Sequence, residues 1–352
     1  KVLVALAEAL LGQGAFQRVI DEITLPRGAS GQLKTHILVA RGNAELGLGE
    51  PDKAEKLFNE ALKAAPDASA HLGLARVAAA KGGLDSALSE VDNALKLAPA
   101  NQGAWLMKAD LRRLKNQPDA ALAAYREVLK IEPAYAAAHL SLASIYLAKN
   151  KIAEARQEIE AAHTLRPNNL SVRYMKALID FRDGKLNAAR DSLQEVLKSA
   201  PEYLPGLLLS AAVNYAQGSY EQAANQLGKV LDKVPTHVYS RKLLAATQVK
   251  IGQYAQALAT LQPLKPEESN DPQLLSMAAD LYLHTTNSPK ARQLLEKAAA
   301  IDPKNAAIRT GLGVSRLAGG DTERALADLE SAATLDTGVG THKADTLLIL
   351  TL

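Results

Sequence analysis

A column of alanines recurs through this sequence at an almost fixed interval. Its members are separated by one step of 33 residues and then seven steps of 34: Ala54, Ala87, Ala121, Ala155, Ala189, Ala223, Ala257, Ala291 and Ala325. A side chain must stay this small where two helices cross closely, because a longer one would push the backbones apart. The period therefore predicts one pair of packed helices, repeated along the chain.

A second column of small residues keeps the same phase. It runs through Gly42, Ala75, Ala109, Ala143, Ala177, Ala211, Ala245, Ala279 and Gly313. Because one column lies in the first helix of each pair and the other in the second, we predict that their alanines are the packing residues of antiparallel hairpins. The central members of this set are Ala109, Ala143, Ala177, Ala211, Ala121, Ala155, Ala189 and Ala223.

Helix-breaking residues follow the same register. Prolines recur where each second helix should end, because proline cannot continue the helical hydrogen bonds: Pro66, Pro99, Pro133, Pro167, Pro201, Pro235 and Pro303. Residues that tolerate a left-handed C-cap recur between the two helices: Gly49, Gly82, Asn116, Asn150, Gly184, Gly218, Gly252 and Gly320. Thr286, next to Asn287, is the exception.

Residues 134–167 resemble the tetratricopeptide repeat, with its pattern W-x2-L-G-x2-Y, A-x3-F, P. The matching residues are His139, Leu142, Ala143, Tyr146, Ala155, Ile159 and Pro167, with His for Trp and Ile for Phe. The resemblance implies an all-α fold, a right-handed superhelical solenoid of antiparallel helix hairpins.

An array of one period is best treated as a single solenoid over residues 1–352. Residues 1–26 predict an incomplete repeat, residues 33–337 about nine full repeats, and residues 338–352 the start of a truncated one. Between Pro263 and Pro272 the segment is rich in proline and acids, so we expect one second helix to end early.

Composition and motifs argue against several functions. Lys plus Arg is 41 against 38 Asp plus Glu, and the net charge of +3 is too small and dispersed for a nucleic-acid surface. Cysteine is absent, which excludes disulfides and thiolate chemistry. The seven histidines never form an i, i+4 pair, so they predict no metal site. We expect a non-catalytic protein without a cofactor.

Three segments, residues 181–223, 270–282 and 312–333, resemble the exosortase-associated PEP-CTERM system TPR-repeat lipoproteins of Gram-negative bacteria. That resemblance implies an envelope protein linked to exopolysaccharide export and a sorting peptidase. It implies a periplasmic location with a lipid anchor, although this sequence contains no anchor cysteine. The alternatives are a cytosolic adaptor or chaperone-like scaffold, and the regulatory array of an enzyme whose catalytic domain lies outside this chain.

The surface left for a partner is the inner face, which this family lines mainly with first helices. Its columns carry polar residues early in the chain and then an apolar stretch that would suit an apolar or amphipathic protein segment with charged flanks. We predict partner contacts at Arg113, Leu140, Tyr174, Leu178, Phe181, Leu208, Tyr215, Tyr239 and Lys242. The alternative is that much of the Leu140 column is buried between successive first helices. A polysaccharide partner is disfavoured, because aromatic residues make up only 4% of the chain.

Overall fold

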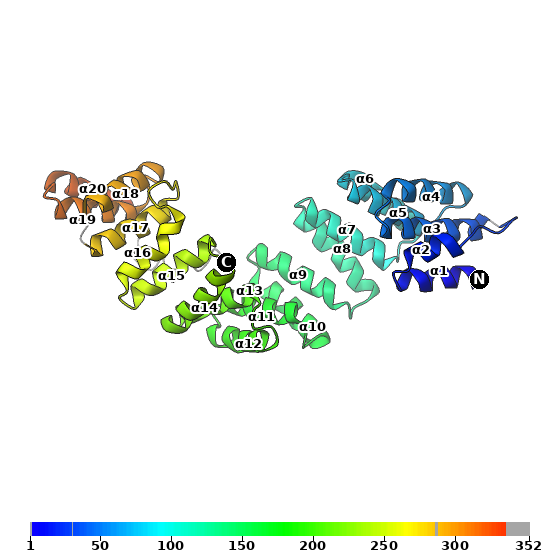
Figure 1. Ribbon diagram of the computed structural model, residues 1–352, viewed down its shortest axis with the longest axis horizontal. Helices are drawn as coiled ribbons and strands as arrows, with labels where there is room; N and C mark the ends of the chain where they lie inside the picture. Colours follow the sequence, from blue (N-terminus) through cyan, green and yellow to red (C-terminus); the bar gives the residue numbers. More distant parts are fainter. Residues whose placement is uncertain (1, 30, 286–287, 336–352) are drawn as a thin grey trace. The chain divides into compact units, whose positions relative to one another are not determined.

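The helices of the computed structural model, which describes residues 2–29, 31–285 and 288–335, pair into antiparallel hairpins (Figure 1). No strand occurs in those ranges. The first hairpin consists of α1 (Val2–Gly12) and α2 (Phe16–Glu22). Further hairpins follow, each a first and a second helix: α3 (Gly31–Gly47) with α4 (Pro51–Ala64), α5 (Ala68–Ala80) with α6 (Leu84–Leu97), α7 (Gln102–Leu114) with α8 (Pro118–Ile131), α9 (Ala136–Ala148) with α10 (Ile152–Leu165), α11 (Leu170–Arg182) with α12 (Leu186–Ser199), α13 (Leu204–Ala216) with α14 (Tyr220–Lys233), α15 (Val238–Lys250) with α16 (Tyr254–Leu261), α17 (Pro272–His284) with α18 (Ser288–Ile301), and α19 (Ala306–Ala318) with α20 (Thr322–Leu335). The predicted all-α class is confirmed.

The turn inside each hairpin depends on one residue with a left-handed backbone. The eight predicted turn residues, from Gly49 to Gly320, all have φ between 55° and 81°. At Gly82 the helix ends in paired bonds: the N–H of Gly82 donates to the carbonyl of Ala79, and that of Gly83 donates to Ala78 at 2.8 Å. These bonds satisfy carbonyls that would otherwise lack a partner at the helix end. Thr286 and Asn287 lie outside the described residues.

The two columns of small residues lie where the helices cross. Every alanine in both columns has 0% exposed surface. The glycines of the second column show how tight the crossing is: a Cβ atom on Gly42 would lie 2.6 Å from the Phe58 ring, and one on Gly313 would lie 2.8 Å from Leu329. Atoms this close must move apart, so even an alanine at either glycine would require the facing side chain to shift.

The predicted early end of one second helix is confirmed. Helix α16 has 8 residues, whereas its counterpart α14 has 14, and a 3-10 turn, η1 (Gln262–Leu264), follows it. The loop after η1 is held by Glu267, which accepts a bond from the Tyr282 hydroxyl at 3.2 Å and pairs with Lys290 at 2.6 Å. The 34-residue phase therefore continues into α17 across an irregular connection.

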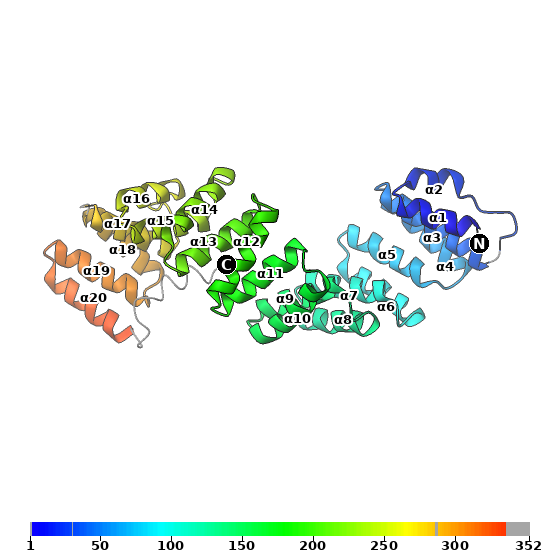
Figure 2. The same cartoon turned by 90° about the horizontal axis from the view of Figure 1, so that it is seen from below.

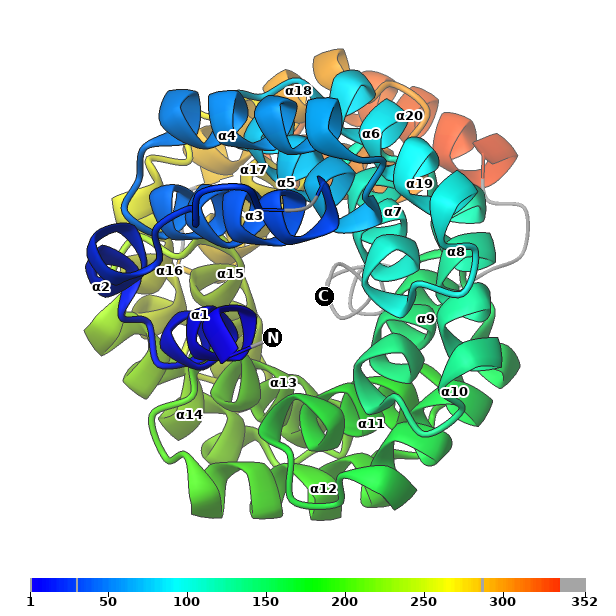
Figure 3. The ribbon, with the colours of Figure 1, turned by 90° about the vertical axis from the view of Figure 1, so that its right-hand side faces the viewer.

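The chain divides into two compact units, residues 1–167 and 168–352. Within each unit the hairpins follow one another in chain order (Figure 2). The first helices of each unit lie along one side and its second helices along the other (Figure 3). None of the described helices combines the length and the apolar character needed to cross a membrane. The predicted repeat boundaries stay a prediction, and the segment 338–352 lies outside the described residues.

Candidate functional site

The first helices of the second unit expose a side turned away from their second helices, which we call the first-helix face (Figure 3). Three rows of residues cross it at 34-residue steps, along α11, α13, α15 and α17. The rows are Tyr174, Leu208, Lys242 and Ser276; Leu178, Ala212, Ala246 and Asp280; and Phe181, Tyr215, Val249 and Leu283. Tyr239 is the second residue of α15 and lies three residues before Lys242 of the first row.

Four of the predicted partner-binding residues are half-buried on this face. Tyr174, Leu178, Leu208 and Tyr239 pack against the core of α11 to α15 and keep part of their surface accessible. The ring of Tyr174 meets that of Tyr203 edge to face, with centroids 5.5 Å apart, which fixes its orientation. Burial raises the pKa of the Tyr174 hydroxyl. These residues form an apolar stripe that a partner could cover.

The expectation that Phe181 and Tyr215 are accessible is wrong. They are 6% and 5% exposed and belong to the core cluster that also contains Ala177 and Leu209. The Tyr215 ring packs edge to face on Tyr220, with centroids 5.6 Å apart. Long aromatic side chains of the third row insert among the packed helices, where they lose apolar surface to the core rather than to a partner.

Lys242 is also not free for a partner, contrary to the prediction. It is 7% exposed, and its ammonium group donates to the Asp271 carboxylate and to Gln273 at 3.0 Å. Asp271 in turn caps α17 by accepting from the N–H groups of Gln273 and Leu274. Burial alone would raise the pKa of Asp271, but the Lys242 ammonium and these N–H groups together hold that pKa below its usual value.

Tyr239 carries an unusual hydroxyl. The oxygen is buried, and it has no hydrogen-bond partner among the described residues. Burial raises the pKa of this hydroxyl, so it stays protonated as a donor. The ring therefore contributes apolar contact to the face rather than charge.

The remaining predicted contacts, Arg113 and Leu140, belong to the first unit, so the structure does not join them with the second-unit residues in one compact body. Arg113 is exposed and Leu140 is half-buried. Nearby on the first helices of that unit, Arg76 donates to Asn43 at 3.3 Å. The first unit thus presents the polar Arg76 in the row where the second unit presents Leu178, whereas Leu140 shares the apolar row of Tyr174 and Leu208.

The histidines that lie between helices pair with carboxylates. His71 meets Glu90 at 2.7 Å and His139 meets Glu158 at 2.6 Å, in each case between the two helices of one hairpin. Within the described ranges, no three His, Asp or Glu side chains gather as metal ligands would. These histidines serve the packing of their hairpins.

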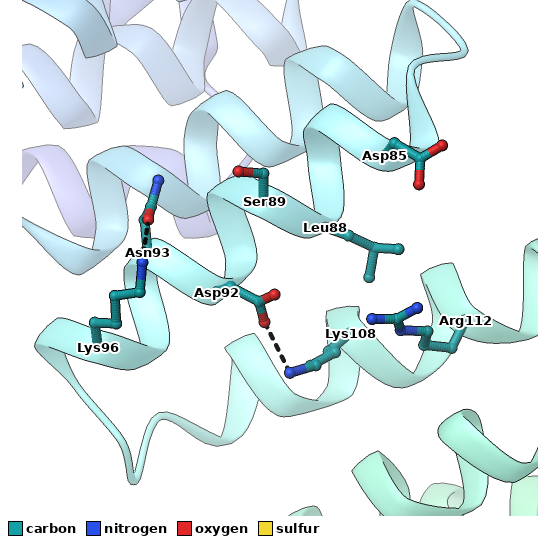
Figure 4. A pocket seen from close by; sticks show the side chains of 8 residues that line it. All are labelled: Asp85, Leu88, Ser89, Asp92, Asn93, Lys96, Lys108 and Arg112. Atoms are coloured by element: carbon teal, nitrogen blue, oxygen red, sulfur yellow. Dashed lines mark hydrogen bonds and ion pairs between the residues drawn. The ribbon is translucent and has the colours of Figure 1, made fainter.

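A depression between α6 and α7, with a volume of about 620 Å³, is lined mainly by polar side chains (Figure 4). Asp92 pairs with Lys108 at 2.7 Å, and Lys96 donates to Asn93 at 3.1 Å. Arg112 donates to Gln117, and Asp85 pairs with Lys115. Its two aspartates are neutralised by lysines, whereas Lys96 and Arg112 are bonded to neutral amide oxygens, and we assign no ligand to this depression.

One tetratricopeptide repeat model matches residues 39–104, 174–238 and 276–339, and a second model of the same repeat matches residues 112–179 and 214–281. No curated protein sequence matches this chain.

Solved structures share the fold at low sequence identity. A tetratricopeptide repeat protein from Parabacteroides merdae is 16% identical, with a TM-score of 0.55 over 70% of this chain and 98% of its own. PilW, described as a type IV pilus biogenesis factor, is 20% identical, with a TM-score of 0.51 over 56% of this chain and 92% of its own. PilF of Pseudomonas aeruginosa is 17% identical, with a TM-score of 0.51 over 60% of this chain and 96% of its own.

Proposed function

The chain belongs to the tetratricopeptide repeat family, and from this premise we propose that it is a non-catalytic scaffold that binds a protein segment on the first-helix face of its second unit. Proteins of this family typically act as scaffolds for protein partners. The observation that carries the proposal is the stripe of half-buried Tyr174, Leu178, Leu208 and Tyr239. A partner that covers it removes apolar surface from water at roughly 25 cal/mol per Å².

We place this scaffold in the bacterial envelope, where it would hold proteins of an exopolysaccharide-export and PEP-CTERM sorting system. The support is the resemblance of residues 181–223, 270–282 and 312–333 to the lipoproteins of that system. A periplasmic location with a lipid anchor on the full-length protein belongs to the same proposal.

Site-specific crosslinking in a bacterium that carries the gene tests both parts. A photoreactive amino acid replaces Leu178 on the first-helix face, and the control places it at Glu221, an exposed residue of second helix α14. We expect position 178 to yield an adduct with a protein of the envelope fraction, weakened by Tyr174→Ser with Leu208→Ser. Equal adducts at both positions would refute the face, and adducts only with cytosolic proteins would refute the envelope setting.

A further inference from the structure

We propose that the segment bound by the second unit carries a single basic residue, lysine or arginine, which pairs with Asp280 amid apolar contacts. This inference rests on the proposed function, because it specifies the partner of the same face. A free Lys242, as predicted from the sequence, would instead have favoured an acidic residue in the partner.

Asp280 is a charged residue on this part of the face. It lies on α17 in the row of Leu178, Ala212 and Ala246, and it is exposed. Among the described residues it makes no hydrogen bond or ion pair, unlike Asp271 at the start of the same helix. Its carboxylate is therefore available to a partner.

Apolar residues flank Asp280 on the helices to either side of α17, while on α17 itself the exposed His284 lies one turn further along. Ala246 and Val249 of α15 keep part of their surface accessible on one side. On the other side, α19 exposes Val314 at 48% and Leu317 at 44%, in the rows of Asp280 and Leu283. A segment that crosses these rows meets apolar surface, one carboxylate, and apolar surface again.

The electrostatic balance selects the sign of the partner's charge. The ammonium of Lys242 is neutralised by Asp271, so it does not offset Asp280. A basic residue placed over Asp280 would gain an ion pair that becomes stronger as the segment excludes water. An acidic residue at that place would be repelled, and an apolar one would leave the carboxylate covered without a partner, which costs affinity.

The experiment is a selection from a library of random displayed peptides on the folded full chain, repeated with Asp280→Lys. The matched control is Asp232→Lys, the same charge change at an exposed residue of second helix α14. For the wild-type chain we expect apolar peptides with one Lys or Arg, and for Asp280→Lys peptides with Asp or Glu at that place. Asp232→Lys should keep the wild-type preference.

Affinities separate the outcomes. A selected basic peptide should bind Asp280→Lys at least about tenfold more weakly than the wild type, and Asp280→Asn should lose the preference without inverting it. If apolar peptides bind regardless of charge, yet Leu178→Ser weakens them, the inference fails and the proposed function stands. If no selected peptide depends on Leu178, the proposed function itself fails. If Asp280→Lys instead dissociates a dimer, the occupant is a second copy, which also overturns the inference.

Discussion

The first and second units tie neighbouring hairpins together at the same two positions but with different chemistry. In the first unit, lysines at the ends of first helices reach aspartates of the preceding hairpin: Lys81 to Asp52 at 2.7 Å, Lys115 to Asp85, and Lys149 to Asp119 at 2.5 Å. In the second unit Gln217 donates to Asn187 at 2.9 Å, an amide pair without charge. Both units therefore use these two positions for contact between neighbouring repeats, and the contact can form with or without charged side chains.

The first-helix faces differ in the same way. Arg76 is exposed in the first unit, whereas the half-buried Leu178 lies in the corresponding row of the second; Arg113, also exposed, shares its row with the buried Phe181. The alanine columns do not differ between the units. Some rows of the repeat therefore specify packing and are uniform, while others face solvent and are free to specify a partner.

The largest effect is expected from Asp328→Ala in the last hairpin of the second unit. Asp328 is 4% exposed and accepts from Arg309 at 3.1 Å and from Arg316 at 2.5 Å. Its loss leaves two partly buried arginines without this carboxylate, which should lower the free energy of unfolding by about 3 kcal/mol. Hydrogen exchange should show the loss in α19 and α20 and not in the first unit. Uniform loss along the chain would contradict nearest-neighbour coupling.

The next largest effect is expected from replacing a column alanine by leucine, which should lower the free energy of unfolding by a similar amount in both units. Ala189→Leu in the second unit and Ala121→Leu in the first should each cost about 1–3 kcal/mol by overpacking. Both alanines are fully buried at helix crossings. Urea unfolding measures the cost, with a Leu substitution at exposed Ala123 as control. A cost in one unit alone would show that the crossings are not equivalent.

A smaller effect should distinguish the units at two helix starts. Tyr135 precedes α9 and Tyr203 precedes α13, and neither side chain caps its helix. Asn101 caps α7 at the equivalent place, so Tyr135→Asn should stabilise the first unit by about 0.5–1 kcal/mol. Tyr203→Asn should gain less, because it also removes the edge-to-face contact with Tyr174. Thermal unfolding followed by circular dichroism tests the ranking, and a reversed order would contradict it.

The smallest effect concerns the charged ties of the first unit. Lys81 and Lys149 lower the pKa of Asp52 and Asp119, so the stabilisation is present above the ordinary pKa of aspartate and is lost as pH falls through the lowered value. Acid or high salt should therefore increase hydrogen exchange in α5 to α10 more than in α13 and α14, once intrinsic exchange rates are corrected. The Gln217 tie does not titrate and serves as the internal control.

The packing of this chain could be predicted from sequence because each crossing needs a small residue at a fixed phase. The left-handed turns at Asn116 and Asn150 and the short α16 followed from local rules in the same way. These features depend on one hairpin and its neighbour, and a single period is enough to place them.

The burial and the ion pairs of the residues on the first-helix face could not be predicted from the same columns. Phe181 and Leu178 both belong to face rows, yet one is buried and the other half-buried, since the two rows lie at different angles around the helix and the row of Phe181 is turned further toward the core. The partner of Lys242 lies in the next repeat, at the cap of α17. The row of Lys242 leads to Ser276 and gives no sign of the Asp271 pairing, whereas the row of Leu178 does lead to Asp280.

The row that runs from Leu178 to Asp280 also sets the distance between the apolar stripe and the carboxylate. Each hairpin adds one position to it, first Ala212 and then Ala246, so the separation between the apolar end and the carboxylate is counted in whole repeats. Duplication or loss of one 34-residue unit would keep every crossing intact and change only this count. The length of the recognised segment could therefore change during evolution by one repeat at a time, with the fold and the types of contact unchanged.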